Sequence, residues 1–211
     1  MSERDQLLEV SEDLQASIAA LAGRVAAQPG VFALTSCARG EGVSFTVANL
    51  AIALAGCTDG DVVMVDGNSE EAVLHTAFGV APDAGAGLRG AMNGEGDADP
   101  IQVAAGLYLL PSGRPGLGGG VSSAQFERVL AGLRGRFPHV LVDLPSLASA
   151  GMTAEWAATA DRVAIVVEAD RTRWQSVAVA NERLAASGAI VEGVVMNKRR
   201  FPIPGWLYRR L

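Results

Sequence analysis

The residues from Thr35 to Phe45 have the types and spacing of a loop that binds phosphate. They follow an apolar run at 31–34 and precede a helical pattern at 47–55. A glycine-rich loop between a strand and a helix turns its backbone N–H groups toward phosphate, and Ser44 stands where a hydroxyl can reach magnesium. The position that should carry a lysine for the outer phosphates holds Val43. The predicted nucleotide-binding residues are Cys37, Ala38, Arg39, Gly40, Glu41, Gly42, Val43, Ser44 and Phe45.

Two aspartates stand where predicted strands end. Asp66 follows the apolar run at 62–65, and Asp143 follows the run at 140–142. Carboxyl ends of parallel strands meet at one edge of a sheet, so both carboxylates are expected beside the loop. There they could orient magnesium through water, whereas the alternative is that each caps the next helix. We predict Ser44, Asp66 and Asp143 as magnesium ligands, with the two aspartates as the catalytic residues of an active protein.

Alternating apolar runs and helical patterns predict the elements that position these residues. Strands are expected at 31–35, 61–66, 106–110, 139–143, 162–168 and 191–196, and helices at 4–27, 44–56, 70–78, 88–92, 122–135, 152–160 and 174–187. This pattern is typical of an α/β fold with a doubly wound, mostly parallel sheet flanked by helices. The predicted units are an N-terminal amphipathic helix at 1–30, a P-loop domain at 31–197 and a basic, aromatic C-terminal tail at 198–211.

Composition narrows the function classes. The net charge of −6 argues against a nucleic-acid partner. No apolar run is long enough to cross a membrane, and the first residues lack a signal-peptide core, so we expect a cytoplasmic protein. The charge is uneven, because the tail holds five cations and no acid while the rest has 12 basic and 23 acidic residues.

The order of these landmarks resembles the bacterial tyrosine kinases (BY-kinases) of capsule and exopolysaccharide synthesis, within the MinD/ParA-like group of P-loop proteins. The resemblance covers about residues 10–200 and includes the loop and helix at 31–55, Asp66, the VLVDLP run at 140–145 and the GVVMN run at 193–197. It implies a P-loop NTPase fold, ATP and magnesium as ligands, and Asn197 near the adenine. It also implies self-association and, as partner, a membrane-embedded polysaccharide co-polymerase that regulates chain length.

The chain departs from this family where the kinase chemistry lies. Val43 and Phe45 replace a lysine and a hydroxyl residue, and Asn68 replaces the second acid of a pair. Glu70 and Glu71 stand where arginine is usual, the helical assembly motif is reduced to Glu12, Gln15 and Ile18, and Tyr208 alone represents the tyrosine-rich tail. We predict a degenerate kinase-like protein without a nucleotide cofactor, which supports exopolysaccharide synthesis or export by docking on the co-polymerase. Two alternatives stay open: an active ATP-binding tyrosine kinase with Arg39 as its cation, and a MinD/ParA-like positioning ATPase.

The tail mixes cations with aromatic side chains. Its predicted contact residues are Lys198, Arg199, Arg200, Trp206, Tyr208, Arg209 and Arg210. Cations near anionic headgroups contribute about 1 kcal/mol each, and aromatic rings favour the interface. We predict a tether to the partner or to the inner face of the cell membrane; the alternative is that the aromatic rings fold back on the domain. Phe45 leaves two interpretations open as well, a ring that fills the space of a nucleotide or one that faces the core.

Overall fold

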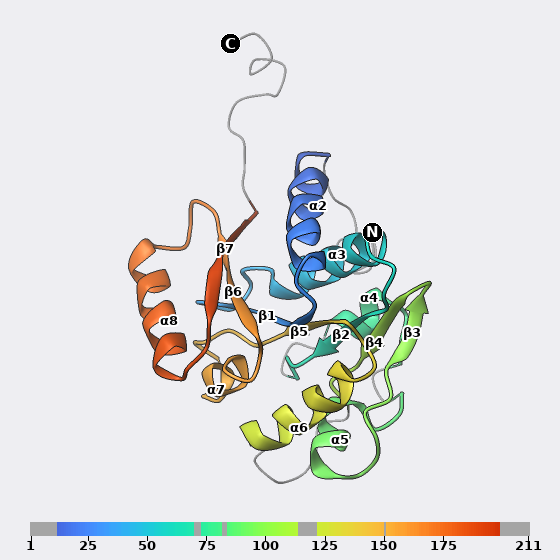
Figure 1. Ribbon diagram of the computed structural model, residues 1–211. Helices are drawn as coiled ribbons and strands as arrows, with labels where there is room; N and C mark the ends of the chain where they lie inside the picture. Colours follow the sequence, from blue (N-terminus) through green and yellow to red (C-terminus); the bar gives the residue numbers. More distant parts are fainter. Residues whose placement is uncertain (1–11, 70–72, 82–83, 114–121, 150, 199–211) are drawn as a thin grey trace.

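Seven strands form one sheet at the centre of the molecule. The computed structural model describes residues 12–69, 73–81, 84–113, 122–149 and 151–198 (Figure 1). The strands are β1 (Gly30–Ser36), β2 (Val62–Asp66), β3 (Ile101–Ala104), β4 (Leu107–Leu110), β5 (His139–Asp143), β6 (Arg162–Glu168) and β7 (Val191–Asn197). Their order in the sheet is β3-β4-β2-β5-β1-β6-β7. All neighbours pair in parallel except β3 and β4, which confirms the predicted doubly wound, mostly parallel α/β fold.

Helices cover both faces of this sheet. They are α2 (Glu12–Ala26), α3 (Val43–Ala55), α4 (Leu74–Ala77), α5 (Gly87–Asn93), α6 (Ser123–Arg134), α7 (Thr153–Ala157) and α8 (Trp174–Ala186). In Figure 1, α2 and α3 lie on one side of the sheet, and α6 and α7 lie on the other. Alternate residues of a strand point to opposite faces, so a central strand must be apolar throughout. The β1 strand meets this condition, because Val31 and Ala33 join one buried cluster while Phe32 and Leu34 join the other.

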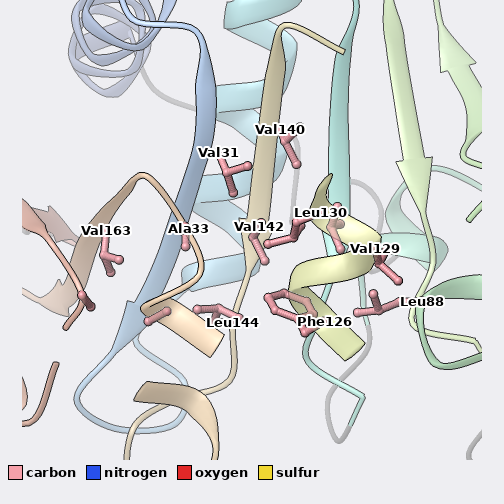
Figure 2. Close-up of a cluster of buried hydrophobic side chains, with 14 of the residues drawn as sticks. Val31, Ala33, Leu88, Phe126, Val129, Leu130, Val140, Val142, Leu144 and Val163 are labelled. Atoms are coloured by element: carbon pink, nitrogen blue, oxygen red, sulfur yellow. The ribbon is translucent and has the colours of Figure 1, made fainter. Parts of the chain in front are cut away.

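The cluster that contains Val31 and Ala33 is built from strand residues and from the helices that cover them. Figure 2 shows Val31, Val140 and Val142 of the central strands beside Phe126 and Leu130 of α6. A capping box fixes the start of α6, because the Ser122 hydroxyl accepts from Gln125 N (3.3 Å) and Gln125 Oε1 accepts from Ser122 N (2.7 Å). On the other face, Ala22 and Val25 pack α2 into the cluster that contains α3.

The observed elements differ from the predicted ones in a few places. Strand β3 was not predicted; it is a four-residue antiparallel strand at the sheet edge, and its exposure alternates along the chain. The helix predicted at 152–160 ends at Ala157, and the one predicted at 70–78 is the single turn of α4, with 70–72 outside the described residues. The helix predicted at 4–27 is described from Glu12 onward. Within the described ranges, no helix has the length and apolar character to cross a bilayer.

Candidate functional site

The loop between β1 and α3 lies at the carboxyl edge of the sheet and has two glycines in the left-handed region. Gly40 has φ 78° and Gly42, the residue before α3, has φ 92°. Left-handed backbone costs a non-glycine residue about 1–2 kcal/mol. Gly42 has a second reason to be glycine, because a Cβ there would lie 2.0 Å from Asn197 Nδ2, whereas a Cβ at Gly40 would meet nothing within 4 Å. The shape of the loop therefore depends on Gly42 and on the end of β7.

Glu41 holds the loop closed from within. Its side chain is almost fully buried, with the residue 4 % exposed, and its carboxylate accepts from Ala38 N (2.9 Å) and from the Thr172 hydroxyl. Asn197, also buried, donates from Nδ2 to the Glu41 carbonyl oxygen (3.0 Å). One loop N–H group that could face a phosphate is thus occupied by the protein's own carboxylate. The Thr172 and Asn197 contacts join the loop to the ends of β6 and β7.

A pocket of about 180 Å³ lies against the loop. Its wall includes Val43, Phe45, Val73 and Leu144, four apolar side chains. Val43 is 8 % exposed and packs into the buried cluster of α2 and α3, so position 43 sends no cation toward the space where phosphate would lie. Phe45 is half-buried and lines this pocket, so its ring does not lie away from the loop. The interpretation that the ring fills nucleotide space stays a prediction.

Two cations lie near the loop, neither in the place of the missing lysine. Arg39 lines the pocket and donates from Nε to Ser149 Oγ (2.9 Å). Lys198 donates from Nζ to the Gly40 carbonyl oxygen (2.5 Å) and pairs with Glu168 (3.2 Å). Lys198 was predicted as part of the tail, but the structure places its ammonium group on the outside of the phosphate loop. Desolvation is the largest single effect on the pKa of Glu168 and raises it, but the hydrogen bonds and positive charges of Lys198 and Arg171 together outweigh it and hold the pKa below its usual range.

Asp66 and Asp143 lie side by side, as register partners at the ends of β2 and β5. Both are fully buried. Burial, reinforced by the neighbouring Asp143, raises the pKa of Asp66 well above its usual value. Burial likewise raises the pKa of Asp143 to about 7, and the nearby Ser44 hydroxyl opposes that rise. The sequence prediction that these carboxylates meet beside the loop agrees with their placement.

These groups fit a magnesium ion, which the structure does not contain. Asp66 Oδ2 and both carboxylate oxygens of Asp143 lack a well-formed hydrogen bond to any described residue. Buried oxygens of this kind are satisfied by a hard cation, and Ser44 supplies a hydroxyl beside them. Asp66, Asp143 and Ser44 would hold the ion, directly or through water, and a bound ion would neutralise phosphate charge. Because burial raises both pKa values, the protonated, neutral carboxyl groups are favoured when no cation is bound.

The remaining predicted residues lie around the loop or outside the described part. Cys37 and Ala38 are not among the residues that line the pocket. Burial, with the Glu41 charge as a second cause, raises the pKa of the Cys37 thiol to about 11, so it stays protonated at neutral pH. Asn197 holds the loop backbone, and its place near adenine stays a prediction. Arg199, Arg200, Trp206, Tyr208, Arg209 and Arg210 lie outside the described residues.

Sequence reasoning did not find several residues of the site. Val73, Ser146 and Ser149 line the pocket, and Thr172 holds Glu41. Ser146 and Ser149 follow the Asp143 strand, and Thr172 follows the end of β6, so each lies just past a strand end. In a parallel sheet those turns converge on the ligand edge. A search of all residues within a few positions of each strand end would have identified them.

Comparisons with known proteins agree with this geometry. The model of the family described as cellulose biosynthesis protein BcsQ matches residues 30–186. The tyrosine-protein kinase CpsD of Streptococcus agalactiae is 26% identical over 173 residues, which cover 80% of this chain and 75% of the kinase. These similarities confirm the resemblance to bacterial tyrosine kinases of the P-loop class.

Solved structures show the same fold. The kinase domain of VpsO superposes with a TM-score of 0.75 at 24% identity, covering 90% of this chain and 98% of that domain. The kinase domain of the Escherichia coli tyrosine kinase ETK gives 0.69 at 16% identity, with 83% and 71% covered. The MinD cell division protein of Aquifex aeolicus gives 0.67 at 19% identity, with 85% and 72% covered. The MinD/ParA-like architecture is therefore confirmed.

Proposed function

This chain belongs to the cellulose biosynthesis protein BcsQ family, and from that premise we propose that it is a degenerate relative of the bacterial tyrosine kinases. In this proposal it supports exopolysaccharide biosynthesis or export by docking on a membrane polysaccharide co-polymerase, at the inner face of the cell membrane. It acts through protein contacts and not through phosphoryl transfer. The relation to CpsD, a tyrosine-protein kinase, supports the link to this class of protein.

The single observation that carries the proposal is the apolar, packed side chain of Val43. A charged hydrogen bond contributes about 1.5–3 kcal/mol, and a lysine over the outer phosphates can make two. Without it, ATP binding is weakened by about one to three orders of magnitude. Phosphoryl transfer also depends on positive charge placed at the transferred group. Val43 carries no charge and packs in the core cluster at the edge of the pocket, so this position supplies no cation to a phosphate.

The residues around the phosphate loop do not replace the positive charge that is missing at Val43. Asp66 and Asp143 supply no positive charge, because a carboxyl group is neutral when protonated and negative when ionised. Lys198 donates to the Gly40 carbonyl oxygen and pairs with Glu168. Phe45 and Leu144 occupy part of the pocket wall with apolar surface. A phosphate chain would therefore meet more apolar and acidic groups than basic ones.

Nucleotide titration tests this part of the proposal. We expect ATP–magnesium to bind with a Kd weaker than about 100 μM, measured by calorimetry on the full chain. We also expect no incorporation of labelled phosphate on incubation with ATP. Low-micromolar affinity together with autophosphorylation would exclude a degenerate site.

A second candidate, an active ATP-binding kinase, is favoured by one observation. Arg39 lines the phosphate pocket, and its long side chain could turn from Ser149 toward a phosphate. If ATP binds, Arg39→Ala should abolish binding under this alternative, while Arg199→Ala should not. Equal affinity of the wild type and Arg39→Ala would rule out arginine as the replacement cation. A MinD/ParA-like positioning ATPase also requires ATP binding, so a titration without binding would exclude both alternatives.

Exposed apolar side chains support the docking part of the proposal. Of the six large hydrophobic side chains found exposed among the described residues, five lie on α8, on β7 or in the turn between them: Trp174, Val179, Ile190, Val194 and Met196. The sixth, Ile52, lies on α3. Apolar surface of this kind marks contacts with other proteins, and β7 is an edge strand with unpaired backbone groups. The basic, aromatic tail at 198–211 begins where β7 ends.

Co-sedimentation with membranes that contain the co-polymerase tests docking. We expect the full chain to sediment with such membranes, and deletion of 199–211 or Met196→Ser to release most of it. Ile52→Ser, an equivalent change on the other side of the sheet, should have no effect. Unchanged sedimentation of both altered chains, with folding intact by circular dichroism, would overturn the proposed dock.

A further inference from the structure

A second pocket adjoins the phosphate pocket at the carboxyl ends of β2 and β5. Its volume is about 340 Å³, within the range of about 300–1,000 Å³ that is usual for small-molecule sites. Its polar lining consists of Asn68, Ser69, Arg89, Ser149, Thr153 and Trp156. Asn68 and Ser149 line both pockets, so the two spaces share a wall. We call this space the Arg89 pocket.

Two buried groups of the Arg89 pocket have no partner. Thr153 is 1 % exposed, and its hydroxyl makes no hydrogen bond to any described residue. The Trp156 indole Nε1 is also buried without an acceptor. One face of the Trp156 ring stacks on Phe126, with centroids 4.5 Å apart, which fixes the plane of the indole ring. Buried polar groups nearly always have partners, so two orphans on one wall indicate an acceptor that completes them.

The charge of the Arg89 pocket is positive. Arg89 is the one ionisable residue among its described lining residues, and it donates from Nη2 to Ser69 Oγ (3.0 Å). On the far side of the shared wall, Arg39 donates to Ser149. Asp66 lines a neighbouring cavity of about 10 Å³ together with Arg89 and Trp156. A cavity of that size holds about one water molecule. Asp66 lines this small cavity and not the Arg89 pocket, so its carboxyl group does not line the space where an anion would bind.

We propose that the Arg89 pocket binds a small oxyanion, a phosphate monoester or a carboxylate. Arg89 is the charged partner, because a guanidinium group presents paired N–H donors to such anions. The Thr153 hydroxyl and the Trp156 indole N–H are donors without an acceptor among the described residues, and the oxyanion supplies the acceptors that they lack. The site does not use the phosphate loop, so it is independent of whether ATP binds.

The Trp156 indole signal provides a local readout in the full chain. The chain has three tryptophans, so three indole N–H signals are expected in a nitrogen-15 spectrum, and Trp156→Phe assigns the relevant one. We expect inorganic phosphate to shift this signal with a Kd of about 10 mM or tighter. Glucose 6-phosphate and acetate distinguish a phosphate monoester from a carboxylate. Glucose, which is uncharged, should give no shift.

Matched variants separate the Arg89 pocket from the phosphate loop. Arg89→Gln should weaken phosphate binding about tenfold or more, because a charged hydrogen bond is lost. Thr153→Val keeps the shape of the side chain and should weaken it severalfold. Arg136→Gln, which removes an arginine paired with Asp99, should have no effect. The proposal is overturned if no anion shifts the Trp156 signal. It is equally overturned if Arg39→Gln abolishes the shift while Arg89→Gln does not, since the anion then binds at the phosphate loop.

Discussion

The phosphate pocket and the Arg89 pocket share Asn68 and Ser149, and an arginine lines each of them, but they differ in the other groups that surround the space. The phosphate pocket has the loop geometry of a nucleotide site, yet its wall contains Val43 and Phe45 and two buried carboxylates lie beside it. The Arg89 pocket has no phosphate loop, but it has an arginine and two unpartnered buried donors. The comparison indicates that the backbone shape of a phosphate loop and the positive charge that binds an anion can be separated in the structure. A glycine loop can fold correctly on its own backbone requirements while the charge that binds an anion lies elsewhere.

The largest expected effect tests the loop geometry. Gly42→Ala should destabilise the protein by at least about 3 kcal/mol, because φ 92° is strained for alanine and its Cβ would overlap Asn197. Gly40→Ala is the matched control, with φ 78° and no atom near its Cβ, and should cost only about 1–2 kcal/mol. Urea unfolding measures both. Equal costs would mean that Asn197 moves freely and does not define the loop.

The next effect tests the charge beside the phosphate pocket. The folded-state pKa of Asp143 is about 7, above its unfolded value of about 3.9, so ionising it opposes folding. The raised pKa of Asp143 adds to the free energy of unfolding fully below about pH 4, and this contribution is lost as the pH rises to about 7. Asp143→Asn should therefore be about 2–4 kcal/mol more stable than the wild type at pH 8 and nearly equal at pH 4.

Unfolding with a chelator and with added magnesium separates the ionisation of the two aspartates from binding of the ion. Denaturant unfolding at several pH values, with chelator present, isolates the ionisation of the pair. Added magnesium should restore wild-type stability at pH 8 and leave Asp143→Asn unchanged, because the ion would satisfy the carboxylate oxygens that lack partners. A wild-type stability that rises with pH between 4 and 7 would contradict the assigned direction.

Restoring the cation gives a smaller effect. Val43→Lys should tighten ATP–magnesium binding by about tenfold, the contribution of roughly one charged hydrogen bond, as measured by calorimetry. Labelled phosphate transfer should still be undetectable, because Phe45 and Asn68 keep their places in the pocket wall. Val43→Met, which adds length without charge, serves as the control. If the lysine variant recovered full kinase activity, the loss of function would depend on position 43 alone.

The smallest effect concerns the Arg89 pocket. Thr153→Val removes a buried hydroxyl that has no partner, so the unliganded protein should gain about 1 kcal/mol of stability. Thermal unfolding at neutral pH without added anions measures this gain. Thr159→Val is a suitable control, because its hydroxyl donates to the Trp156 carbonyl oxygen and its loss should be destabilising. A destabilised Thr153→Val would show that the hydroxyl is already satisfied.

The fold class followed from local patterns. Continuous apolar runs such as 62–65 and 140–142 are typical of strands covered on both faces, and helical patterns between them favour a parallel sheet. The glycine loop, the missing lysine at position 43 and the pairing of Asp66 with Asp143 were also predictable, because strand ends meet at one edge. Strand β3 was not predictable in the same way. It has four residues and pairs antiparallel at the edge, so neither length nor a buried run identified it.

The sheet, the loop and the lack of a lysine in that loop can all be predicted from the order of the residues, because each depends on spacing within a short segment. The distant groups that complete the site are known from the packed structure alone. That structure placed Lys198 on Gly40, 158 positions away in the chain, and Thr172 on Glu41, 131 positions away. It also joined Arg89 with Trp156 around one pocket. Contacts of this range depend on how helices and turns pack on the sheet, and no local period in the sequence records that packing.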